Sequence, residues 1–203
     1  MNWLAHVLLS KDSIENQLGN LLADPLKGRA FDGASSEFKD GLELHFIIDH
    51  FTDTHPIIKD AKRALTKKGY LKGVVLDILY DYFLSKNWDT YCNINREEFL
   101  EEFRRNALRV IPNYPQNAID IIMQVVVNRQ LLSYSSLDGV YRALCRVDNK
   151  LSNRLKAKEC ATAYLPLIKE ELEYLERGFL YFFPELIKEV KSKREYKFEH
   201  LKL

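Results

Sequence analysis

Side chains that bind metal ions are concentrated at helical spacing in the first half of the chain. Residues four apart on a helix lie on one face, one turn above each other. Four pairs of ligating side chains have this spacing inside apolar segments: Asn2 and His6, Asn20 and Asp24, His45 and Asp49, and Asp77 and Asp81. Asp53 extends the third pair by one more turn. The spacing predicts that each pair points its two side chains in the same direction.

Burying these carboxylates among large apolar residues is unfavourable unless a positive charge meets them. A divalent metal ion turns their mutual repulsion into shared attraction. Mixed histidine and carboxylate ligands suit Mn²⁺, Fe²⁺, Mg²⁺ or Zn²⁺, and a set rich in carboxylates favours the harder ions. We therefore expect a metal centre whose candidate ligands are His45, Asp49, Asp77 and Asp81, with His6, Asn20 and Asp53 as further candidates.

A plainer interpretation competes with the metal centre. A single pair at this spacing is most often one solvated face of a helix. His6 taken alone fits a packing residue of the core or of the N-terminal segment. His50 and His55 are out of phase with the stripe of His45 and Asp49, so both are expected to be exposed. Four pairs in one half of the chain nevertheless favour a site.

Charged groups near the pairs suggest further roles. Asp24 is a candidate for another metal ligand or for the base that takes a proton from water, and Lys27 for a group that steadies a phosphate. A basic run lies further along the chain and consists of Lys59, Lys62, Arg63, Lys67, Lys68 and Lys72. This run is either a solvated helix face or a docking surface for an acidic partner.

Length, charge and cysteine content bound the class of protein. The chain has 203 residues, enough for one sizeable core, and its formal net charge of +1 does not point to nucleic acid or a membrane surface as a partner. Its three cysteines include no C-x-x-C pair, which is typical of free thiols in a reducing compartment. No apolar run approaches the ~20 residues of a membrane span. We expect a cytoplasmic protein, and the sequence leaves its oligomeric state open.

Apolar residues recur at three- and four-residue spacing, which predicts an all-α fold in a single domain over residues 1–203. The low counts of glycine (8) and proline (6) agree with long helices. The expected helices cover residues 13–28, 37–55, 56–69, 70–88, 95–111, 115–135, 135–153 and 158–195. Ser13 and Asn95 are expected N-caps, Gly69 is an expected C-cap, and Pro166 and Pro184 are expected kinks in the last helix. Residues 188–203 are expected to form a surface helix or a frayed tail.

Four motifs resemble a known family. "MNWLAH", "GNLLADPLKG", "HFIIDHFTDTHP" and "LDILYDYFLSKNW" are similar, in this order and spacing, to the successive motifs of the acyl carrier protein phosphodiesterase family. The resemblance extends over essentially the whole chain. It implies an all-helical fold that is distantly similar to the HD metal-dependent phosphohydrolases. It also implies an activity, the removal of 4′-phosphopantetheine from the serine of holo-acyl carrier protein, supported by Mn²⁺ or Mg²⁺.

The resemblance also implies site residues. The positions that match acidic or histidine positions of the family are Asp24, His45, Asp49, Asp53, Asp77 and Asp81. The family commonly has a histidine where this chain has Tyr82, and a second one where it has Asn87. If either histidine serves the site, its role must fall to Tyr82, His6 or water. Metal affinity or substrate range would then differ.

Three functions remain open at this level. The first is the hydrolysis of holo-acyl carrier protein to the apo form. The second is a metal-dependent phosphohydrolase that acts on another small phosphoester. The third is a non-catalytic module that binds acyl carrier protein, a small and strongly acidic protein.

Overall fold

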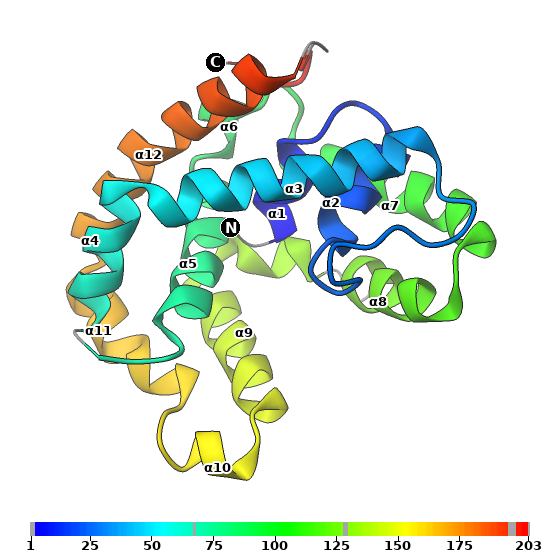
Figure 1. The fold of residues 1–203 in the computed structure, drawn as a ribbon. Coiled ribbons are helices and arrows are strands. Elements are labelled where there is room, and N and C mark those ends of the chain that lie inside the picture. Colours follow the sequence, from blue (N-terminus) through cyan, green and yellow to red (C-terminus); the bar gives the residue numbers. More distant parts are fainter. Residues whose placement is uncertain (1–2, 67, 128–129, 195–197, 203) are drawn as a thin grey trace.

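Helices form this protein, which we describe from a computed structural model (Figure 1). The structure describes residues 3–66, 68–127, 130–194 and 198–202. The α-helices are α1 (Trp3–Leu8), α2 (Ile14–Leu22), α3 (Ser36–Thr54), α4 (Pro56–Leu65), α5 (Lys72–Lys86), α6 (Trp88–Tyr91), α7 (Arg96–Val110), α8 (Gln116–Val127), α9 (Leu137–Lys150), α10 (Asn153–Lys156), α11 (Leu165–Glu170) and α12 (Leu172–Lys193). Three short 3₁₀ helices connect them, namely η1 (Ile111–Asn113), η2 (Leu131–Ser135) and η3 (Ala161–Tyr164).

The all-α prediction is confirmed. Across the described residues the only strand-like pairing is an isolated β-bridge between Cys92 and Leu201. None of the helices in this part of the chain is long and apolar enough to span a lipid bilayer.

Helix α3 crosses the molecule and organises the elements around it (Figure 1). It begins after Ser35, whose hydroxyl accepts a hydrogen bond from the Phe38 N–H at 3.1 Å, and it ends at Thr54 because Pro56 starts the next helix. Helix α2 packs along α3, and α4 and α12 contact α3 as well. Helix α1 lies between α2 and α5, so α1, α2, α3 and α5 together surround one region.

Two glycines allow α2 and α3 to approach closely. A Cβ atom at Gly19 would lie 2.1 Å from the carbonyl oxygen of Phe38, and a Cβ atom at Gly41 would lie 2.2 Å from that of Asn16. Backbone atoms at such distances leave no room for any side chain, so both positions require glycine. The close packing brings the Asn20 backbone within 2.9 Å of the His45 ring.

Aromatic residues hold α5 against α12. The rings of Tyr80 and Phe179 contact edge to face at 5.3 Å between centroids, and those of Phe83 and Phe179 lie 5.9 Å apart. All three side chains are buried. Full burial of such a ring stabilises the fold by roughly 1.5–3 kcal/mol. This core fixes the helix that carries Asp77 and Asp81.

Some expected helix ends are confirmed and others are wrong. Asn95 caps α7 by accepting from two backbone N–H groups, while Ser13 precedes α2 without a capping hydrogen bond from its side chain. Helix α4 stops at Leu65 with Thr66 as its C-cap, so Gly69 does not cap it. Residues 115–135 are not one α-helix, because α8 ends at Val127 and η2 follows; residues 128–129 lie outside the described chain.

The expected helix over 158–195 is divided into η3, α11 and α12. Pro166 stands in the first turn of α11, where a missing N–H is harmless, so it starts a helix rather than kinks one. Pro184 lies inside α12 as expected. Residue 195 lies outside the described chain.

The C-terminal segment is not frayed in its described part. Phe198 and Leu201 are buried, and the buried His200 places Nε2 2.7 Å from the carbonyl oxygen of Leu8. The Asn93 N–H also donates to the carbonyl of His200 at 3.0 Å. The expectation of a frayed tail is therefore wrong for residues 198–202, because their apolar side chains join the core.

Replacing Gly41 tests the contact between α2 and α3. We expect Gly41→Ala to lower the free energy of unfolding by about 1–3 kcal/mol, because the new Cβ forces the two backbones apart. Urea unfolding followed by circular dichroism measures the change. Gly73→Ala is the matched control, since its Cβ would meet only the Lys62 side chain at 4.0 Å. Equal stability of Gly41→Ala and the wild type would contradict the packing constraint.

Candidate metal centre

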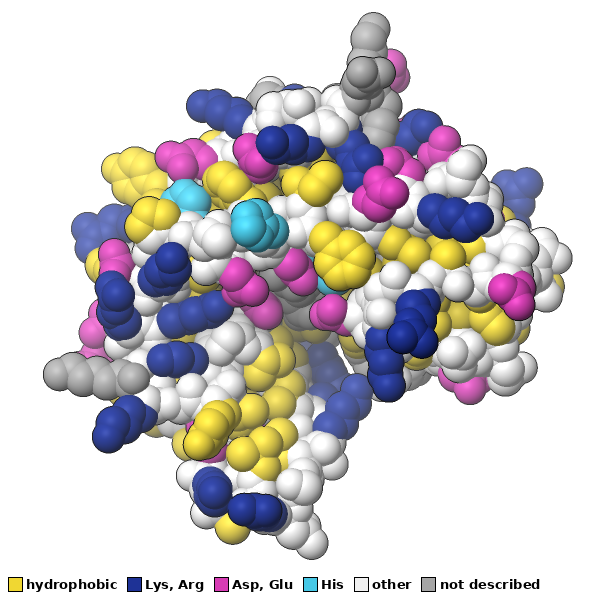
Figure 2. Space-filling model, viewed as in Figure 1, with side chains coloured by type: hydrophobic (Ala, Val, Ile, Leu, Met, Phe, Trp, Pro, Cys, Tyr) yellow, Lys and Arg dark blue, Asp and Glu magenta, His cyan; other side chains and the backbone are white. Residues whose placement is uncertain are grey.

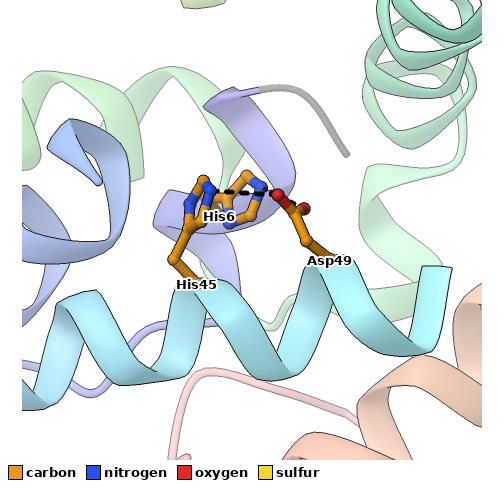
Figure 3. A group of neighbouring side chains, drawn as sticks. All are labelled: His6, His45 and Asp49. Carbon is orange, nitrogen blue, oxygen red and sulfur yellow. Dashed lines mark ion pairs between the residues drawn. The ribbon is translucent and has the colours of Figure 1, made fainter. Parts of the chain in front are cut away.

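Three ligand-bearing side chains meet between α1 and α3: His6, His45 and Asp49 (Figure 3). Their ligand atoms all lie within 4.8 Å of one another. Nε2 of His6 lies 3.3 Å from Oδ1 of Asp49, and Nε2 of His45 lies 3.0 Å from its Oδ2. The two rings are stacked, with centroids 4.3 Å apart. Both histidines are buried while the Asp49 side chain is 32% exposed, so solvent reaches the group from the carboxylate side.

Asn20 orients both imidazole rings from α2. Its Oδ1 accepts from Nδ1 of His6 at 2.7 Å, and its backbone carbonyl accepts from Nδ1 of His45 at 2.9 Å. The amide cannot turn over, because its Nδ2 donates to the carbonyl of His6 and to the hydroxyl of Ser10, each at 2.9 Å. Both Nδ1 atoms therefore carry the N–H, and both Nε2 atoms face Asp49. Metal-binding histidines are usually oriented in this way by their second nitrogen.

Contacts within the group determine its charge. Burial lowers the pKa of His45, but hydrogen bonds to Asp24 and Asp49 outweigh burial and raise that pKa to about 9. Burial raises the pKa of Asp49, yet the hydrogen bond from His45, together with the contact with His6, outweighs this effect and holds the pKa well below its usual range. Burial lowers the pKa of His6. At neutral pH without metal, the group is therefore a protonated His45 between carboxylates.

The donor set fits a divalent metal ion. Two histidine nitrogens and a carboxylate form a known ligand set of catalytic sites, which leave further positions for water or substrate. A divalent ion would take the place of the proton on His45, since metal ligands must be deprotonated. The residues that would hold the ion are His6, His45 and Asp49.

Asp24 lies on the solvent side of this group. Its Oδ1 is 3.3 Å from Nε2 of His45, and its side chain is 81% exposed. The hydrogen bond to His45 lowers the pKa of Asp24, which keeps the carboxylate charged. Asp24 is therefore close enough to act on a molecule bound beside His45.

A tight turn follows Asp24 and carries Lys27. Lys27 and Gly28 both adopt left-handed backbone conformations, with φ of 54° and 69°. A Cβ atom at Gly28 would lie 2.7 Å from the ring of Phe46, which is 54% exposed, so the turn lies against that ring. Lys27 is exposed. Its expected role with phosphate stays a prediction.

Asp81 performs another task in this structure. Its carboxylate accepts from the N–H groups of Leu4 and Ala5, at 3.0 and 3.3 Å, and so caps the N-terminus of α1. The side chain is fully buried, and burial raises its pKa to about 8 even though the two hydrogen bonds lower it. Asp77 is half-buried one turn earlier on α5. Neither belongs to the close group of His6, His45 and Asp49.

Asp53 and two other histidines also lie apart from the group. The Asp53 side chain is 72% exposed and pairs with Nζ of Lys62 at 3.0 Å. His50 is exposed as expected. The expectation that His55 is exposed is wrong: its ring caps α4 through the Ile57 N–H and places Nε2 2.9 Å from Glu185.

The positions where the resemblance implies histidine make other contacts in this structure. Tyr82 packs its ring against Phe83, with centroids 5.6 Å apart. The Asn87 side-chain amide donates to Glu176 on α12 at 3.1 Å, and Lys86 forms an ion pair with the same carboxylate. The second imidazole of the three-residue group comes from His6 on α1.

Sequence reasoning ranked His6 and Asn20 below the aspartates of α5 and missed Ser10 entirely. Ser10 is buried, donates to the carbonyl of His6 at 2.7 Å and accepts from Asn20. Its only signal was its spacing of four residues from His6 in an otherwise apolar segment. The cap by Asp81 had no signal, because it joins residues 77 positions apart.

The fold and site define an all-helical protein with a candidate metal centre of two histidines and a carboxylate. Comparison with known sequences agrees with this class: the family model described as acyl carrier protein phosphodiesterase matches residues 1–186. The chain therefore belongs to the acyl carrier protein phosphodiesterase family.

Curated relatives carry the same description. An acyl carrier protein phosphodiesterase of Yersinia pestis is 29% identical over 96% of this chain and 100% of its own length. Proteins of that name from Enterobacter sp. strain 638 and Escherichia coli O6:H1 are 28% and 25% identical, over 96% and 95% of this chain and 100% and 99% of their own. No solved structure matches the chain, and the expected likeness to HD phosphohydrolases stays a prediction.

Asp81 variants separate a helix cap from a metal ligand. We expect Asp81→Ala to lower the free energy of unfolding by about 1–3 kcal/mol for each buried N–H left without a partner. Asp81→Asn keeps an acceptor and should lose clearly less, while binding Mn²⁺ as the wild type does. Urea unfolding and calorimetric Mn²⁺ titration measure the two effects. A complete loss of Mn²⁺ binding in a folded Asp81→Asn protein would instead place Asp81 among the ligands.

Proposed function

We propose that this protein is a divalent-metal-dependent phosphodiester hydrolase that removes 4′-phosphopantetheine from holo-acyl carrier protein and leaves the apo form. The observation that carries this proposal is the convergence of His6, His45 and Asp49 in a chain of the acyl carrier protein phosphodiesterase family. Mn²⁺ or Mg²⁺ is the proposed metal, since carboxylates around the histidines favour harder ions.

The first requirement of the proposed reaction is to neutralise the negative charge of the phosphodiester. A phosphodiester is anionic and repels a nucleophile, so the site must neutralise charge and supply an activated water. A divalent ion held at this centre would lower the pKa of water and bind a non-bridging phosphate oxygen. The protein contributes ligands that are already oriented, because Asn20 holds both rings with their Nε2 atoms facing Asp49.

Asp24 is the proposed general base. Its carboxylate is exposed, charged and 3.3 Å from Nε2 of His45, so it can take a proton from a water beside the centre. Asp24 would serve equally as a further ligand. Lys27, three residues on in the adjoining turn, is proposed to neutralise the phosphate.

A basic surface beside the centre is proposed to dock acyl carrier protein. We define the basic surface as Lys59, Lys62, Arg63 and Lys68 on and just after α4. Figure 2 shows Lys and Arg side chains gathered over α4, on the same face as the acidic side chains below α3. Within the described chain, Lys62 and Arg63 pair with Asp53 and Asp60, whereas Lys59 and Lys68 make no ion pair. Lys67, also part of the expected run, lies outside the described residues.

A mass assay tests the reaction and the base. Purified protein with Mn²⁺ should convert holo- to apo-acyl carrier protein, and prior treatment with EDTA should abolish conversion until Mn²⁺ is restored. We expect Asp24→Asn to lower kcat by about 10²–10⁴-fold, the usual contribution of a general base. Asp32→Asn is the matched control, because it removes an exposed carboxylate that has no part in the proposed site, and its kcat should stay within about threefold of the wild type.

Three results would contradict these assignments. No conversion with any divalent metal would refute the activity, and a panel of nucleotides and other phosphodiesters would then reveal a different hydrolase. Binding of acyl carrier protein without turnover or bound metal would identify a binding module. Full activity of Asp24→Asn would remove Asp24 from its proposed role only.

Charge reversal tests the basic surface. We expect the double variant Lys59→Glu, Lys68→Glu to raise KM for holo-acyl carrier protein at least fivefold at low salt, with little change in kcat, because it weakens attraction to an acidic partner. The difference should shrink as salt screens the charges. Arg105→Glu, an exposed position on α7, is the control. An unchanged KM in the double variant would exclude this surface as the docking site.

A further inference from the structure

A cavity of about 310 Å³ opens among α1, α5, α8, η2 and α9. Its walls are mostly apolar, and they include Trp3 of α1, Val74 and Ile78 of α5, and Val147 of α9. Figure 2 shows hydrophobic side chains over α9 directly below the acidic side chains that lie beneath α3. Pockets for small organic ligands have this character and begin at about this volume.

The cavity shares two helices with the candidate metal centre. Trp3 stands one turn before His6 on α1. Ile78 stands three residues, or about 5 Å of helix rise, before Asp81, which binds the first turn of α1. The cavity and the candidate metal centre therefore lie on neighbouring turns of α1, and the cap by Asp81 ties α5 to the same helix.

One half-buried arginine in the cavity wall has a buried donor atom without a hydrogen bond. Nη2 of Arg146, on α9, is buried and makes no hydrogen bond to any described residue. Leaving a charged donor buried without a partner costs more than leaving a neutral one. Gln130, also in the wall, is buried, and its side-chain amide has both a donor and an acceptor. The cavity thus combines mostly apolar walls with a few polar side chains.

We propose that this cavity holds the pantetheine arm of the substrate while its phosphate lies at the metal centre; this proposal rests on the proposed function. The arm is a narrow chain of methyl, methylene and amide groups. The apolar walls would contact its hydrocarbon groups, and Arg146 and Gln130 would form hydrogen bonds with its amides. Nη2 of Arg146 donates to an amide carbonyl of the arm. A protein surface would not fit here, because protein interfaces are far larger than this cavity.

Binding of free 4′-phosphopantetheine tests the cavity directly. We expect Arg146→Met and Val74→Trp each to weaken its binding to the Mn²⁺-loaded protein at least tenfold in calorimetric titration. The first removes the donor, and the second fills the mouth of the cavity from a residue that is 38% exposed. The same variants should raise KM for holo-acyl carrier protein, while their Mn²⁺ affinity and thermal midpoint stay at the wild-type values.

Two matched variants control for general damage. Arg142→Met removes an exposed arginine from the same helix, and Leu180→Trp adds a tryptophan on α12 at a position that is also 38% exposed. Both should bind 4′-phosphopantetheine as the wild type does. If the wild type converts holo- to apo-protein but the cavity variants bind and turn over normally, the cavity assignment is overturned and the activity stands. If the wild type converts nothing, the activity fails, and loss of binding in the cavity variants alone would still support the cavity.

Discussion

The hydrogen bonds of Asn20 to the two histidines are the interaction on which the site depends. The bond to His45 depends on Gly19 and Gly41, which let the backbones of α2 and α3 approach closely. One asparagine then sets the tautomer of both rings, through its side chain for His6 and through its carbonyl for His45. The packing of α2 therefore fixes the orientation of the His6 and His45 rings.

Charge interactions also make substitutions around His6, His45 and Asp49 unfavourable. Buried histidines and carboxylates are unfavourable individually, and each is retained because its neighbours supply the compensating contact. His45 holds Asp24 and Asp49, and Asp81 satisfies the first N–H groups of the helix that carries His6. The aspartate on α5 therefore supports the centre through α1, from a distance, rather than by joining it.

Sequence patterns predicted the helical class, the bounds of α3 to within a residue or two, and the shared face of His45 and Asp49, because these follow from local periodicity. They also indicated Asn20 and Asp24 as one pair. They placed Asp77 and Asp81 ahead of His6, whereas the structure brings His6 to His45 and Asp49 and leaves both aspartates outside that group. A stripe on one helix does not reveal which other helix it faces. His55 and the tail residues 198–202 were misjudged for a related reason, since their partners Glu185 and Leu8 are remote in sequence.

By itself, the sequence determined the family, the all-α class and the chemical types available for the site. Spacing along one helix and the four motifs are local properties, so they can be read from the chain directly. Tertiary structure decided which of those groups meet. Placing His6 of α1 over Asp49 of α3 requires the cap by Asp81, the glycine contact of α2 with α3 and the bridging amide of Asn20. Each of these joins residues far apart in the chain, and their energies are settled by packing rather than by local propensity.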